Sequence, residues 1–110
     1  MSERIQSFRD FFPYYLREHS APACRALHYV GTVLGSAAFL VFLVTLDWRF
    51  LVAYPVLGYG FAWVSHAFIE RNKPATFTYP VWSLMGDYKM LWLWATGRLK
   101  PHLDAALKAA

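Results

Sequence analysis

Two histidines, His28 and His66, stand at opposite ends of a long apolar stretch that Asp47, Trp48 and Arg49 interrupt near its middle. His28 precedes Trp48 by about as many residues as His66 follows it, so at ~1.5 Å per helical residue each leg rises roughly 27–30 Å, one bilayer core. If the legs are antiparallel helices, the two imidazoles return to the same depth on the same side. Ionisable groups in or beside a membrane are costly, which makes this pair a candidate for function.

Three further side chains can join the pair, namely His19, Glu70 and Asp87. His66 and Glu70 are four residues apart, so they share one face of a helix. Residues 20–22 end in a proline, and the break in helix that this predicts lets His19 fold back. Asp87 can approach from the last predicted helix.

Two or three imidazoles with one carboxylate are a ligand set for a single transition metal. With open coordination positions this set is typical of non-haem Fe(II) oxygenases, and zinc accepts the same donors in hydrolases. The residues leave the choice of metal open. A simpler interpretation makes the histidines hydrogen-bonding surface groups and Glu70 part of a solvated helix end. It makes Cys24, the single cysteine, a small apolar helix residue, and His102 incidental.

The elements that must position these side chains follow from composition and periodicity. The chain has 110 residues, of which 57% are hydrophobic and 19% aromatic, more than a soluble domain of this size can bury. We therefore expect one all-α domain over 1–110, an integral membrane helical hairpin of two spans with amphipathic or interfacial helices at both ends. The patterns predict an amphipathic helix at about 3–17, spans at about 24–46 and 50–70, an interfacial helix at about 80–97 and a frayed tail from Leu103.

Small residues predict where the two spans meet. Gly31, Gly35 and Ala38 lie near one face of the first span, and Gly58 and Ala62 near one face of the second. Small faces let membrane helices approach closely. Because two spans rarely enclose a site alone, a homodimer is plausible.

Basic residues flank the two spans, and within the connection only Arg49 is basic. The positive-inside rule then puts both termini in the cytoplasm, at the inner membrane if the protein is bacterial. The N-terminus has no signal-peptide pattern, so we expect the first span to be an uncleaved anchor. The aromatic residues suit a membrane interface, and no array for binding nucleic acid is present.

Residues 14–22, 27–31, 60–76 and 79–87 resemble the Mpo1-like family of small membrane proteins, typified by a fungal 2-hydroxy fatty acid dioxygenase of α-oxidation. The most specific block is His66-x-x-x-Glu70-Arg71-Asn72-x-Pro74-Ala75, joined to the upstream histidines. The fungal protein has additional membrane-spanning sequence between its histidine blocks, Ser20 stands where Asn or His is common, and the last block follows a bacterial branch. The fold and site therefore carry over better than the substrate.

The resemblance implies an Fe(II)-dependent dioxygenase that removes one carbon from a 2-hydroxy long-chain fatty acid with O₂. By position, the family's histidines fall on His19, His28 and His66, with Glu70 or Asp87 as an additional ligand or a partner of one. Arg71 or Lys73 would steer the carboxylate of the substrate. The alternatives are a non-catalytic membrane protein that binds lipid or a membrane partner, and a metal-dependent hydrolase.

Overall fold

A computed structural model describes residues 4–108, and every regular element in that range is helical. Two groups of helices form compact units, Ala21–Pro74 and the combination of Met1–Ser20 with Ala75–Ala110. We name them the hairpin unit and the terminal unit. The predicted all-α class is confirmed. The elements are α1 (Phe8–Arg17), α2 (Pro22–Thr45), α3 (Trp48–Ser65), the π-helix η1 (His66–Glu70), the 3₁₀-helix η2 (Ala75–Phe77), α4 (Pro80–Ala95) and α5 (Leu99–Lys108).

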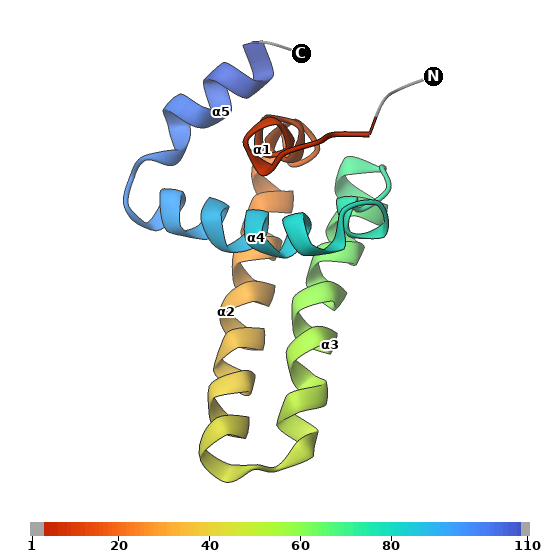
Figure 1. Ribbon diagram of the computed structural model, residues 1–110, viewed down its shortest axis with the longest axis vertical. Helices are drawn as coiled ribbons and strands as arrows, with labels where there is room; N and C mark the ends of the chain where they lie inside the picture. The colour runs from red at the N-terminus through yellow and green to blue at the C-terminus, as the bar shows by residue number, and fades with distance from the viewer. Residues whose placement is uncertain (1–3, 109–110) are drawn as a thin grey trace. The chain divides into compact units, whose positions relative to one another are not determined.

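The hairpin unit consists of α2 and α3, which run side by side in opposite directions (Figure 1). Leu46 ends α2 in the left-handed conformation with φ of 57°, and Asp47 caps α3 by accepting a hydrogen bond from the Arg49 amide at 3.1 Å. Pro22–Thr45 and Trp48–Glu70 are both long and apolar enough to cross a membrane. The two-leg hairpin predicted from the apolar stretch is therefore confirmed.

Two glycines of α2 set how closely the helices approach. A Cβ added at Gly31 would lie 2.9 Å from the Cβ of Phe61 and 3.0 Å from the Leu57 carbonyl oxygen, and one at Gly35 would lie 2.9 Å from the Tyr54 carbonyl oxygen. Gly58 differs from the expectation, because a Cβ there would meet open space. It contributes its backbone to the seam, whereas Gly31 and Gly35 contribute the absence of a side chain.

Aromatic side chains of α1 join it to α4 in the terminal unit, among them Phe11, whose ring lies 5.7 Å from that of Trp82. Tyr15 of α1 is fully buried and packs against Gly86 of α4, where a Cβ would lie 2.9 Å from the ring. Its hydroxyl donates to the Asp87 carboxylate. The buried face of α4 carries Ser83, Gly86, Met90 and Leu93. Other large apolar side chains of this helix are exposed, among them Val81 and Trp92.

The ends of the terminal unit correct two predicted boundaries. Helix α1 begins at Phe8, later than the expected residue 3, because Ser7 caps it and the Ile5 amide instead donates to the Tyr79 hydroxyl at 2.9 Å. The expected frayed tail is also wrong, because α5 runs from Leu99 to Lys108 with Leu99 and Ala106 buried. Gly97, with φ of 73°, allows the turn into α5.

Candidate metal centre

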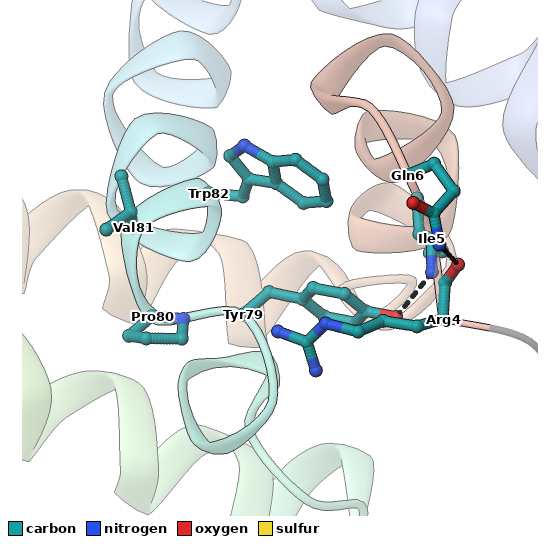
Figure 2. A pocket seen from close by; sticks show the side chains of 7 residues that line it. All are labelled: Arg4, Ile5, Gln6, Tyr79, Pro80, Val81 and Trp82. Atoms are coloured by element: carbon teal, nitrogen blue, oxygen red, sulfur yellow. Dashed lines mark hydrogen bonds between the residues drawn. The ribbon is translucent and has the colours of Figure 1, made fainter.

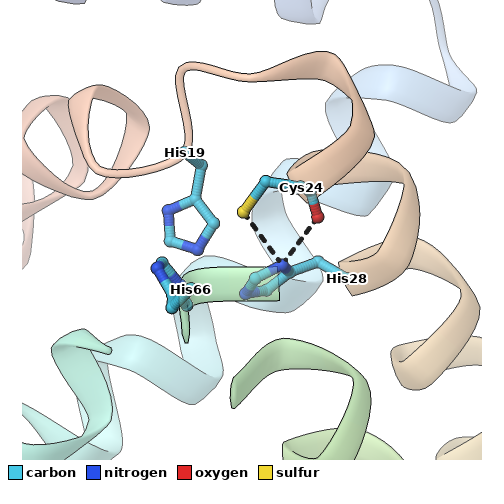
Figure 3. A group of neighbouring side chains, drawn as sticks. All are labelled: His19, Cys24, His28 and His66. Carbon is cyan, nitrogen blue, oxygen red and sulfur yellow. Dashed lines mark hydrogen bonds between the residues drawn. The ribbon is translucent and has the colours of Figure 1, made fainter. Parts of the chain in front are cut away.

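Three side chains of the hairpin unit meet at one buried place (Figure 3). Cys24, His28 and His66 each offer a ligand atom, and these atoms lie within 4.8 Å of one another. The imidazole rings of His28 and His66 have centroids 5.0 Å apart and are nearly perpendicular. The hairpin thus brings together the two histidines as their spacing from Trp48 predicts. Their binding of a metal stays a prediction.

His28 is held in place by the preceding turn of α2 and by α3. Its Nδ1 lies 2.9 Å from the carbonyl oxygen of Cys24 and 3.3 Å from the hydroxyl oxygen of Ser65. The Ser65 hydroxyl donates to the Ala62 carbonyl at 2.6 Å, and the Cys24 thiol donates to Ser65 at 3.3 Å. The serine therefore joins the cysteine and the histidine in one hydrogen-bonded group.

His66 begins the π-helix, and the end of that helix supplies its partner. Its Nδ1 lies 2.6 Å from Oδ1 of Asn72. Arg71 adopts the left-handed conformation with φ of 58°, and the amide of Asn72 then donates to the His66 carbonyl oxygen at 3.0 Å. The main chain after the helix thus curls back, which carries the Asn72 side chain to the imidazole.

His19, which Figure 3 also labels, belongs to the terminal unit. It follows the last turn of α1, where its Nδ1 lies 2.6 Å from the Tyr15 carbonyl oxygen. The imidazole stacks on the Tyr15 ring at a centroid distance of 4.0 Å. Within its own unit, His19 is therefore fixed both by a hydrogen bond and by ring contact.

The two carboxylates considered as ligands have other contacts. Glu70 accepts a hydrogen bond from the Ala21 amide at 2.6 Å, which ties the start of α2 to the end of η1. Asp87 lies in the terminal unit and accepts the hydrogen bond from Tyr15. The pKa of Asp87 is raised to about 7, because the effect of burial exceeds the opposing effect of the hydrogen bond from the Tyr15 hydroxyl. Within residues 4–108, the group of side chains placed to hold a metal includes neither carboxylate.

The remaining candidates lie at exposed positions. Arg71 and Lys73 are both exposed at the end of the hairpin unit, and the conformation of Arg71 gives it a role in the turn that precedes Asn72. His102 lies on α5 with its ring 6.3 Å from that of Phe12. The role of Arg71 and Lys73 in steering the substrate carboxylate stays a prediction.

Sequence reasoning missed three residues of this group, namely Cys24, Ser65 and Asn72. Cys24 could have been found, because it precedes His28 by one helical turn and so shares its face. Ser65 adjoins His66. Asn72 stands in the motif block that begins at His66, but it lies beyond the helix end, where periodicity no longer predicts the direction of a side chain.

The donor atoms suit a borderline transition metal. Imidazole nitrogens bind iron, zinc and copper, and the buried position of His28 and His66 keeps bulk water away from them. The Cys24 sulfur lies 3.3 Å from the Ser65 hydroxyl oxygen, and it would bind a metal only after losing its proton, because the thiolate is the ligand form. The group thus fits a metal held mainly by histidine.

A separate pocket of about 400 Å³ opens on the terminal unit (Figure 2). The guanidinium of Arg4 lies 4.6 Å from the centre of the Tyr79 ring and donates to the Thr78 carbonyl oxygen at 2.8 Å. None of the predicted metal-site residues lines this pocket. Its lining consists of Arg4, Ile5, Gln6, Tyr79, Pro80, Val81 and Trp82.

Comparison with known proteins identifies one family. A family model described as 2-hydroxy-palmitic acid dioxygenase Mpo1-like matches residues 5–99, and it agrees with the resemblance carried by the motifs. No curated protein and no solved structure matches the chain. The match includes His19, His28 and His66 together with Asn72.

Proposed function

The chain belongs to the Mpo1-like family, and from this premise we propose that it is an Fe(II)-dependent dioxygenase that shortens 2-hydroxy long-chain fatty acids by one carbon. The observation that carries the proposal is the buried meeting of His28 and His66, with ring centroids 5.0 Å apart. Two imidazoles that share a buried place supply nitrogen donors that suit a transition-metal cation.

His19 is the third proposed ligand, because the chain connects it closely to the hairpin unit. Only Ser20 separates it from Ala21, so its Cα lies within about 7 Å of the Ala21 Cα in any arrangement. The Ala21 amide is itself bonded to Glu70, one turn after His66. This tether supports a three-histidine set of His19, His28 and His66, with Glu70 holding the start of α2 instead of binding metal.

Bound Fe(II) would supply a centre for O₂ activation and for chelation of the substrate's carboxylate and 2-hydroxyl. The protein's own residues would do three things. The histidines hold the cation and leave coordination positions open, the packed hairpin excludes water, and the exposed cations Arg71 and Lys73 attract the substrate carboxylate.

Membrane insertion is part of the proposal. Large apolar side chains of α2 and α3 are exposed, among them Val44 at 85%, Val56 at 63% and Leu40 at 62%. In water such surface would be costly, whereas lipid chains cover it. The histidines at one end of the hairpin would then let an acyl tail stay in lipid while its polar head reaches the metal, with both chain termini cytoplasmic.

The test is metal analysis together with O₂ uptake. The protein is purified in detergent and supplied with Fe(II) and 2-hydroxypalmitate. We expect about one iron per chain and substrate-dependent O₂ uptake, with both lost in His28→Ala and His66→Ala. His102→Ala is the matched control, because it also removes an imidazole in contact with another ring, that of Phe12, but outside the proposed metal site. Absence of turnover in the native protein, or unchanged turnover in His66→Ala, would refute the proposal. Stable metal-free protein would favour the non-catalytic lipid-binding or partner-binding alternative.

Cys24 favours a second candidate function, a zinc-dependent hydrolase, because a cysteine with histidines is a common zinc ligand set. The variant Cys24→Ala separates the two. An iron site held by histidines keeps its metal and its O₂ uptake in this variant. A zinc site that uses the thiolate loses its metal, and zinc in the native protein would be stoichiometric.

A further inference from the structure

Each of the three histidines has an oxygen atom beside its Nδ1. The Nδ1 of His19 lies 2.6 Å from the carbonyl oxygen of Tyr15, and that of His28 lies 2.9 Å from the carbonyl oxygen of Cys24. The Nδ1 of His66 lies 2.6 Å from Oδ1 of Asn72. In all three, the nitrogen that a metal would bind is therefore the second ring nitrogen, Nε2.

The two carbonyl contacts determine the tautomer of their histidines. A carbonyl oxygen only accepts, so a neutral imidazole beside it must carry its proton on Nδ1. At His28 the neighbouring Ser65 cannot reverse this, because its hydroxyl proton is already donated to the Ala62 carbonyl. A neutral His19 or His28 that donates from Nδ1 to its carbonyl presents an unprotonated Nε2, the form that binds a metal.

His66 is different, because its partner is a side-chain amide that contains both an acceptor and a donor. We propose that Asn72 is a positioning residue that holds His66 as the Nδ1–H tautomer and so directs its Nε2 lone pair to the metal. The main chain favours this role. The Asn72 amide is bonded to the His66 carbonyl oxygen, and the left-handed Arg71 turns the chain to make that bond.

The proposal has a consequence for affinity that rests on the proposed metal site. Partners that fix the outer nitrogen of a ligand histidine orient its ring and raise its basicity, and their loss costs about 10–100-fold in metal affinity. Asn72 is a side-chain partner, whereas the carbonyl oxygens beside the Nδ1 atoms of His19 and His28 belong to the main chain. Substitution of Asn72 therefore removes its contact and leaves those two main-chain contacts in place.

The test is NMR of ¹⁵N-histidine-labelled protein in detergent, without metal and at pH 8, where long-range couplings report which ring nitrogen is protonated. We expect the Nδ1–H tautomer at His66 in the native protein. Asn72→Asp keeps an acceptor and should keep that tautomer. Asn72→Ala should shift His66 toward the Nε2–H form and weaken Co(II) binding about 10–100-fold, with the tautomer of His28 unchanged as the internal control for folding.

An Nε2–H tautomer of His66 in the native protein would overturn the proposal, as would an unchanged tautomer in Asn72→Ala. The NMR measurement uses neither iron nor substrate. A protein with the expected tautomers but no O₂ uptake would therefore refute the dioxygenase proposal and leave the role of Asn72 standing.

Discussion

Substitution of Gly31 by alanine tests how the hairpin positions its histidines. The added Cβ would lie 2.9 Å from the Phe61 Cβ, 3.0 Å from the Leu57 carbonyl oxygen and 3.2 Å from that of Gly58. Two of these three neighbours are backbone atoms of α3, which no rotamer change can move. The helices must therefore separate by a few tenths of an ångström.

The expected magnitude comes from two opposing effects. Overpacking of a tight contact costs about 1–3 kcal/mol, while replacing glycine by alanine within a helix recovers about 1 kcal/mol. Gly60→Ala is the matched control, because its Cβ meets nothing within 4 Å and the helical gain applies there as well. The difference between the two variants isolates the steric cost, about 1–3 kcal/mol against Gly31→Ala.

Thermal unfolding in detergent, followed by circular dichroism, measures this difference as several degrees in Tm. Co(II) titration measures the effect on the site. Gly31 follows His28 within one helical turn, so separation of the helices also draws His28 from His66 and should weaken Co(II) binding. Gly35→Ala, which meets the Tyr54 carbonyl, should cost similar stability with less effect on the metal. Equal Tm and equal affinity in Gly31→Ala and Gly60→Ala would refute the reasoning.

Three further predictions follow from single contacts. Because the folded pKa of Asp87 is raised to about 7, the free energy of unfolding should fall as the pH rises from about 4 to 7, by up to about 1.4 kcal/mol per pH unit. In measurements of Tm against pH, Asp87→Asn should flatten this slope. An unchanged slope in the variant would contradict the raised pKa. Arg71→Gly should gain up to about 1 kcal/mol because it relieves a left-handed residue, whereas Arg71→Val should lose stability, as Tm can show. Asp47→Ala removes the cap of α3 and should lower the free energy of unfolding by about 1 kcal/mol. An unchanged Tm in this variant would contradict the prediction.

Much of the hairpin could be predicted from the sequence. The two apolar legs, the polar turn between them and the small residues Gly31 and Gly35 follow from composition and helical periodicity, and these also bring His28 and His66 to one depth. The errors lie where periodicity stops. Ser7 and the Tyr79 contact of Ile5 delay the first helix, and burial of Leu99 and Ala106 creates the last one.

The sequence by itself thus determined an all-helical hairpin with paired histidines and, through its motifs, the family. Only the tertiary structure decided which atoms surround those histidines. Cys24 and Ser65 join His28 across two helices, and Asn72 reaches His66 through a π-helix and a left-handed Arg71. The physical reason is that helical periodicity predicts which face a residue occupies. The direction of a side chain beyond a helix end depends on backbone angles that the packed structure selects.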